Sequence, residues 1–184
     1  MVLRLTNLIL FLLFLYSCSR DPVNFIENED LFDNPLDSST VEYDLPALTF
    51  FPNAVETGYG QNFSVQIFAL GYDNLAGSHV FFEYDPNRVE VSSLLPGTVF
   101  SGEVNDPIFF MTNDTENGIV TISTALLASD SSSVSALGSI AQIELTALAT
   151  GQAKLQFLTD SEMVGPNDNI ISTKGFGEAI INIQ

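Results

Sequence analysis

The chain has 184 residues, with 23 acidic and only 5 basic side chains, and its formal net charge is −18. Nucleic-acid binding needs clustered lysines and arginines, so we exclude nucleic acid as a partner. One cysteine, Cys18, and one histidine, His79, cannot supply the usual zinc ligand sets or a Ser-His-Asp or Cys-His arrangement. No glycine-rich phosphate loop is present either. We therefore predict a protein that is not an enzyme and needs no cofactor or metal, although an enzyme built on carboxylates alone stays open.

Residues 1–17 have the features of a secretory signal that leads into a lipidation site. Arg4 supplies the positive start, and Leu8 to Leu15 are eight uninterrupted apolar residues. Eight residues cannot cross a bilayer as a helix, which takes about 20. Because Leu15 and Ser17 occupy the positions that a bacterial lipobox uses, we predict cleavage before Cys18 and lipid attachment to Cys18. The mature protein would then be tethered to a membrane of the bacterial cell envelope, periplasmic or surface-exposed; an ordinary signal peptide or an uncleaved anchor helix is the alternative.

Residues 18–44 are interpreted as an acidic flexible tether. They contain eight acidic residues and a single basic residue, Arg20, together with Pro22 and Pro35 and little regular periodicity. A flexible chain of this length spans about 30 Å on average. Apolar pairs such as Phe25-Ile26 leave open that part of the segment docks on a surface.

Residues 45–184 have the pattern of one β-sandwich domain. Short runs of β-branched and aromatic residues alternate with Gly, Asn, Asp and Pro, which predicts about nine strands in an all-β sandwich. The clearest strand is Ile140 to Leu148, in which Ala141, Ile143, Leu145 and Ala147 would face the core. The other predicted strands lie at Leu45–Phe51, Phe63–Ala69, His79–Tyr84, Arg88–Ser92, Ile108–Met111, Ile119–Thr124, Leu155–Phe157 and Ala179–Ile183.

One turn in this domain has a physical signature of its own. Tyr84-Asp85-Pro86 ends a strand, since Pro86 cannot continue a sheet ladder and Asp85 can accept hydrogen bonds from the turn backbone ahead of it. With the following short apolar strand, Val89 to Val91, this stretch resembles the cohesin family, the modules of cellulosome scaffolds that bind dockerins.

The order of the remaining segments is similar to cohesins as well. The similar segments are Gly58-Tyr59-Gly60 before Phe63, Asn117-Gly118 before Ile119, Leu137 to Ile143, and Gly151 before Leu155. Together with the Tyr84-Asp85-Pro86 stretch, these segments extend the resemblance over nearly all of residues 46–184, and it implies a jelly-roll β-sandwich. A carbohydrate-binding module or another jelly-roll sandwich is the competing interpretation of the fold.

The resemblance also implies where a partner would bind. In many cohesins, two polar residues at alternating positions on the strand before Tyr-Asp-Pro contact the dockerin, and Gly77 and His79 occupy those positions here. Alternation makes His79, Phe81 and Glu83 point away from the core if Val80 and Phe82 point into it. The family patch also uses the end of a later strand and its loop, here Leu126, Ser129 and Asp130.

Asn113 to Gly118 could offer oxygen ligands to calcium. The spacing lacks the EF-hand pattern, and Asn117-Gly118 is typical of a tight turn, so we predict a turn and no metal.

These observations predict a non-catalytic, membrane-anchored protein-binding module. The resemblance implies a dockerin-like partner, possibly one that carries a glycan-degrading enzyme. Two alternatives stay open: a carbohydrate-binding module that takes polysaccharide, and a structural envelope lipoprotein. The chain has no tryptophan and its 15 phenylalanines favour core filling, which weighs against an aromatic sugar platform.

Overall fold

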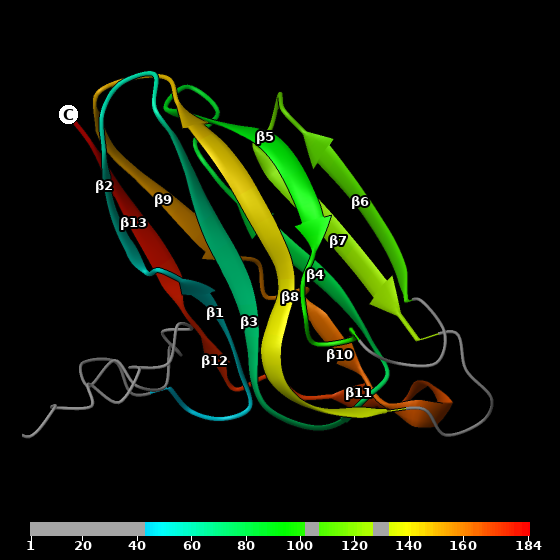
Figure 1. The fold of residues 1–184 in the computed structure, drawn as a ribbon. Coiled ribbons are helices and arrows are strands. Elements are labelled where there is room, and N and C mark those ends of the chain that lie inside the picture. Colours follow the sequence, from blue (N-terminus) through cyan, green and yellow to red (C-terminus); the bar gives the residue numbers. More distant parts are fainter. Residues whose placement is uncertain (1–42, 102–106, 127–132) are drawn as a thin grey trace, which may run out of the picture. The chain divides into compact units, whose positions relative to one another are not determined.

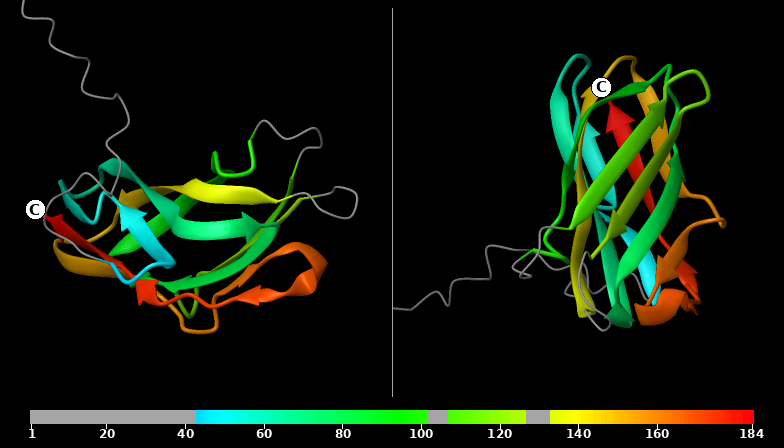
Figure 2. Two further views of the ribbon diagram at one scale, coloured as in Figure 1. Left: turned by 90° about the horizontal axis from the view of Figure 1, so that it is seen from below. Right: turned by 90° about the vertical axis from the view of Figure 1, so that its right-hand side faces the viewer.

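The computed structural model describes residues 43–101, 107–126 and 133–184. In these residues it contains thirteen β-strands and one 3-10 turn. The strands form two sheets that lie face to face, as the two layers in Figure 2 show. The predicted all-β sandwich is confirmed.

Sheet A has five strands in the order β12-β1-β3-β8-β5. Their bounds are β1 Ala47–Phe51, β3 Asn62–Leu75, β5 Val89–Pro96, β8 Val134–Ala147 and β12 Gly175–Phe176. The long antiparallel pair β3 and β8 forms its middle and crosses the front of the sandwich in Figure 1. The register of this pair shifts after Ile67 and again beyond Leu70, so the two strands bend as they cross the core.

Sheet B has eight strands. Their bounds are β2 Ala54–Thr57, β4 Gly77–Glu83, β6 Ile108–Asp114, β7 Ile119–Ala125, β9 Gly151–Phe157, β10 Glu162–Val164, β11 Ile170–Ile171 and β13 Glu178–Ile183. Strand β4 pairs with β7 along its whole length, and on its other side with β10 at its start and with β9 at its end. Strand β6 pairs with β7 and lies at the edge of the sheet (Figure 1).

The predicted strands are all present, and the structure adds what the sequence pattern did not predict. Strands β2, β10, β11 and β12 are two to four residues long, which is too short for an alternating pattern to be recognised. Strand β3 was expected to end at Ala69 but continues to Leu75. The adjacent residues Ala69 and Leu70 are both buried, so the period of two is interrupted there, and it resumes with Tyr72 between two register shifts of β3 against β8.

A cluster of phenylalanine rings joins the two sheets. Phe50 of sheet A stacks on Phe157 of sheet B with ring centroids 4.1 Å apart, and it meets Phe82 edge to face at 5.7 Å. Phe82 and Phe157 are partners across β4 and β9. The three rings are buried, and they fix which face of each strand looks into the core.

The turn at Tyr84-Asp85-Pro86 forms as its residues predict. One carboxylate oxygen of Asp85 accepts a hydrogen bond from the backbone N–H of Asn87 at 3.0 Å. Arg88 lies 3.4 Å from the Asp85 carboxylate and donates to the carbonyl of Thr150. The turn is therefore tied to the loop between β8 and β9.

The compact unit that contains the sandwich extends from Ser38 to Gln184. Every residue of the hydrophobic core lies within it, so this unit carries its own core and is a self-contained folding unit. Residues 1–17, Cys18 and nearly all of the predicted tether at 18–44 lie outside the described residues. No helix in the described part of the chain is long and apolar enough to cross a membrane.

We predict that Phe50→Ala destabilises the sandwich by about 3–5 kcal/mol, because it removes the ring that contacts both Phe82 and Phe157 and leaves a cavity. Denaturant unfolding of residues 38–184 measures this change. Phe110→Ala is the control: that side chain is 61% exposed, and we expect a change of about 0.5 kcal/mol or less. Equal losses in the two variants would contradict the aromatic cluster as the centre of the core.

A second prediction concerns alkaline pH. The Tyr72 hydroxyl is hydrogen-bonded to Thr173 at 2.7 Å, and burial raises the pKa of Tyr72 from 10.0 to about 12. As the pH rises, Tyr72 therefore loses its hydroxyl proton at a lower pH in the unfolded chain than in the folded one. The contribution of protonated Tyr72 to the free energy of unfolding is complete below pH 10 and is lost as the pH rises through about 12. We expect the free energy of unfolding to fall less steeply over pH 10–12 in Tyr72→Phe than in the parent. Parallel pH profiles would contradict this.

Candidate functional site

The residues singled out on β4 divide between the two faces of sheet B. Val80 and Phe82 are fully buried in the core, whereas His79 and Phe81 are half-buried on the outer face and Glu83 is exposed. The expected alternation is confirmed. The core contacts of Val80 and Phe82 thus present His79 and Phe81 outward.

His79 and Phe81 are held in place by their neighbours. The His79 ring lies edge-on to the Phe81 ring with centroids 4.4 Å apart, and its Nδ1 is 2.7 Å from the Ser123 hydroxyl on β7. The Phe81 backbone N–H donates to the Ser161 hydroxyl, which in turn donates to the Phe81 carbonyl. The ring contact and the Ser123 hydrogen bond position the two aromatic rings, and Ser161 holds the strand backbone beneath Phe81.

The register of sheet B extends this surface across three more strands. His79 lies opposite Ser123 on β7 and Glu162 on β10, and Ser123 lies opposite Phe110 on β6. One row of outward side chains therefore contains Phe110, Ser123, His79 and Glu162. The neighbouring row contains Ile108, Ala125, Gly77, Val164 and Ile170.

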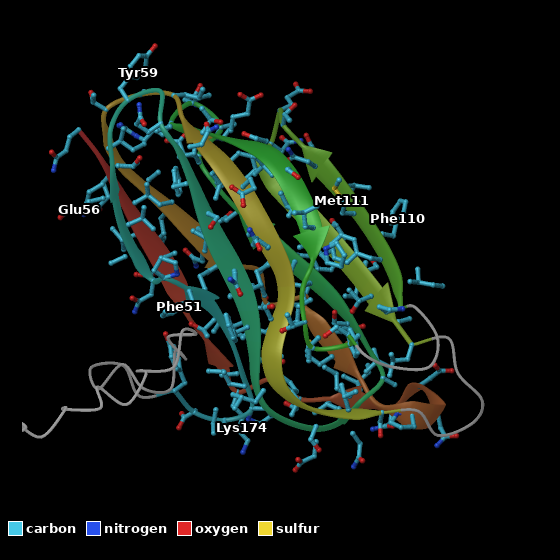
Figure 3. The ribbon with its side chains drawn as sticks, in the orientation of Figure 1. Phe51, Glu56, Tyr59, Phe110, Met111 and Lys174 are labelled. Carbon is cyan, nitrogen blue, oxygen red and sulfur yellow. The ribbon has the colours of Figure 1, made fainter. Side chains whose placement is uncertain are left out.

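Strand β6 contributes large exposed apolar side chains to this face. Phe110 is 61% exposed and Ile108 is 46% exposed, and both belong to the outward rows. Met111 lies next to Phe110 on β6 in Figure 3 but is directed to the other side of the strand, opposite the buried Ile122. Contiguous exposed apolar side chains are typical of protein contact surfaces. We call this surface, formed by the outward residues of β6, β7, β4 and β10, the outer face of sheet B.

A hollow of about 490 Å³ lies at one end of this face. It is lined by residues from the start of β4, the end of β7 and the segment from Val164 to Asp168, which includes the 3-10 turn η1 (Pro166–Asp168). Figure 1 shows β10 and η1 at this lower end of the sandwich.

The charges on this face are of one sign. Residues 76–83, 107–126 and 158–173 contain no lysine or arginine. The exposed carboxylates in these segments are those of Glu83, Asp114, Glu116, Asp160, Glu162 and Asp168. The face therefore combines apolar side chains with negative charge.

The structure brings together most of the site residues that the sequence predicted. Gly77, His79, Phe81 and Glu83 lie along β4, and Leu126 lies beside the start of that strand, because its backbone N–H donates to the Ala76 carbonyl at 2.9 Å. Ser129 and Asp130 lie outside the described residues. Whether these positions contact a partner stays a prediction.

Sequence reasoning missed the contributions of β6 and β10. Ile108 to Met111 was recognised as a strand, but its apolar residues occur on both faces, so the pattern did not show which of them are exposed. Glu162 and Val164 belong to a strand of three residues that pairs with β4 across more than 80 positions of sequence. No local signal predicts that contact.

The loop after β6 forms the predicted turn. The Asp114 carboxylate accepts hydrogen bonds from the Asn117 side chain and from the backbone N–H groups of Asn117 and Glu116. The Asn117 amide side chain is the main reason that the pKa of Asp114 lies below its usual value. Among the residues that the structure describes, no group of three or more His, Cys, Asp or Glu side chains could hold a metal ion.

The described residues thus form a two-sheet β-sandwich whose outer face on sheet B carries exposed apolar side chains. The family model for the cohesin domain matches residues 48–178, and the chain belongs to this family. Cohesins are non-catalytic protein-binding modules, in agreement with the prediction that the chain is not an enzyme. No curated protein matches the sequence.

Solved cohesin structures share the fold at low sequence identity. A non-cellulosomal cohesin from Archaeoglobus fulgidus is 16% identical, with a TM-score of 0.61 over 75% of this chain and 91% of that one. A type II cohesin–X-dockerin complex from Acetivibrio cellulolyticus is 17% identical, with a TM-score of 0.63 over 75% of this chain and 98% of that one. A type I cohesin–dockerin complex from Clostridium thermocellum is 11% identical, with a TM-score of 0.62 over 78% of this chain and 98% of that one. These likenesses confirm the cohesin-type β-sandwich.

Proposed function

We propose that this chain is a membrane-anchored cohesin that holds a dockerin-like partner on the outer face of sheet B. The observation that carries the proposal is the outward row of Phe110, Ser123, His79 and Glu162, which spans four strands. Aromatic side chains fixed on a rigid sheet are the type of residue that dominates protein interfaces. The solved structures from Acetivibrio cellulolyticus and Clostridium thermocellum named above are cohesins in complex with dockerins, which supports the choice of partner.

The half-buried state of His79 and Phe81 favours a pre-organised interface. Their ring contact and the hydrogen bond between His79 and Ser123 restrict these side chains before any partner arrives, and Ser161 holds the Phe81 backbone. Less conformational entropy is then lost on binding. Phe110 adds exposed apolar area, so its burial by the partner would contribute further to the affinity.

The second part of the proposal is the anchor. With lipid attached at Cys18, residues 18–44 would connect the sandwich to a membrane of the bacterial envelope. A bound partner would be kept near the surface at a raised effective concentration, without any chemistry in the cohesin itself. A partner that carries a glycan-degrading enzyme would gain access to surface polysaccharide in this way.

We predict that a His79→Ala, Phe81→Ala double variant of residues 38–184 binds its partner more weakly than the parent domain does. The bait is the domain, the prey is the envelope and secreted fraction of the host, and the retained proteins are identified by mass spectrometry. Loss of two side chains at the centre of the face should weaken capture of dockerin-bearing proteins at least about tenfold.

The matched control for that experiment is Gln66→Ala, Phe68→Ala on β3. These half-buried residues are likewise two positions apart, on a central strand of the other sheet. The control should capture partners as the parent does. Capture that is equal for the parent and both variants would contradict this face as the interface. Retention on polysaccharide without any dockerin-bearing protein would favour the alternative of a carbohydrate-binding module.

The anchor is tested on the full chain in a bacterial host that is fed an alkyne-tagged fatty acid. We expect the parent protein to carry the label and to sediment with membranes, and Cys18→Ser to carry none, because the only thiol has been removed. Asn24→Ser is a control in the same segment that should keep the label. An unlabelled parent protein would rule out lipidation.

A further inference from the structure

The hollow on the outer face of sheet B exists because its floor consists of small residues. Gly77 on β4 lies opposite Ala125 on β7, whereas the next outward residue of β4 is His79. A Cβ added at Gly77 would lie 2.8 Å from the Thr124 carbonyl oxygen, so a larger residue does not fit there unless the backbone shifts. The close approach of β7 to β4 therefore both requires the glycine and leaves the surface recessed above it.

The walls of the hollow are apolar near the floor. Val164 and Pro166 lie on the β10 side, and Leu126 lies at the end of β7. Two backbone hydrogen bonds hold these walls to the residue before β4: Ala76 N–H donates to Val164 at 2.8 Å, and Leu126 N–H donates to Ala76 at 2.9 Å. The hollow is thus built into the sheet and does not depend on a single flexible side chain.

The rim on the β10 side is a constrained loop. Asn167 and Asp168 both have left-handed backbone angles, with φ of 62° and 58°. Asn and Asp are the residues other than glycine that best tolerate this conformation. The loop is closed by the Gly165 N–H, which donates to the Asn169 carbonyl at 2.8 Å. The sequence of the loop therefore suits its backbone conformation, and the loop is held at the edge of the recess.

The electrostatics of the hollow favour a cation. Asp168 lines it, and the exposed Glu162 lies beside it opposite His79. The surrounding segments of β4, β6, β7, β10 and η1 contain no lysine or arginine that could neutralise these carboxylates. A positively charged group would therefore enter without displacing an existing ion pair.

We infer that this hollow binds one arginine side chain of the partner, and that it determines which partners this cohesin accepts. An arginine can lay its aliphatic stem against apolar walls while its planar guanidinium donates to a carboxylate and to backbone carbonyls. The volume of about 490 Å³ lies within the roughly 300–1,000 Å³ of pockets that take a small ligand. This inference rests on the proposed function, since it assigns a role to one end of the same face.

The test is an NMR titration of the ¹⁵N-labelled unit 38–184 with N-acetyl-L-arginine amide. The matched probe is N-acetyl-L-citrulline amide, which has nearly the same shape and no charge. We expect saturable amide shifts centred on Gly77, Ala125 and Gly165 with the arginine probe, and affinity at least about fivefold weaker with citrulline. Shifts spread over the whole surface, or equal binding of the two probes, would overturn the inference.

Three variants locate the charge and the cavity. Asp168→Asn keeps the size and the tolerance of left-handed angles, and should weaken arginine binding at least about fivefold. Asp160→Asn removes the same charge from the turn between β9 and β10, outside the hollow, and should change binding less than about twofold. Ala125→Leu should abolish binding by filling the hollow. Unchanged binding in Asp168→Asn would contradict the assignment, and the dispersed spectrum of each variant reports whether it is folded.

Failure of this inference can be told apart from failure of the proposed function. In one outcome, Asp168→Asn leaves arginine binding and partner capture unchanged, while His79→Ala, Phe81→Ala abolishes capture. This outcome would contradict the arginine site and support the proposed interface. If the arginine probe binds as described but no dockerin-bearing protein is captured, the proposed dockerin-like partner is contradicted. Cation binding by the hollow is then still supported.

Discussion

The contact of Phe50 with Phe82 and Phe157 is the constraint on which the outer surface depends. It presses β1 of sheet A against β4 and β9 of sheet B, and Phe82 can reach it from only one face of β4. Because side chains alternate along a strand, burial of Phe82 forces Phe81 outward. A shift of one residue would bury Phe81 and His79 and expose Val80 and Phe82, which the core does not tolerate.

Core packing therefore decides which side chains form the outer face, and the types of those side chains decide its chemistry. Strand β4 is paired with β7 on one side and with β10 and β9 on the other, and Ser161 binds the Phe81 backbone between these two pairings. Recognition, as we propose it, is therefore left to the outward side chains. Strand β6, at the edge, adds Phe110 and Ile108. A central strand thus provides fixed aromatic rings and an edge strand provides exposed apolar area, and an interface uses both.

The parts of the site that could be predicted are those that depend on local alternation. Val80 and Phe82 mark the inner face of β4 in the sequence itself, as does Tyr84 directly after the strand, and the outward position of His79, Phe81 and Glu83 follows from them. The hollow could not be predicted in this way. It depends on the pairing of Val164 with Gly77 and on the left-handed angles at Asn167 and Asp168, and neither leaves a periodic signal. Pro166 and Asn167 are typical turn residues, but strand β10 before them has only three residues and no recognisable pattern.

The negative charge of the chain has two consequences that reinforce each other. On the outer face of sheet B, carboxylates without basic neighbours favour encounter with a positively charged partner and disfavour acidic competitors, an effect that ionic strength weakens. With the anchor that we propose at Cys18, the same charge would repel the domain from anionic lipid headgroups within about 10 Å of the membrane. An acidic tether and an acidic sandwich would then both be directed away from the bilayer. The binding face would stay open to a basic partner instead of resting on the membrane.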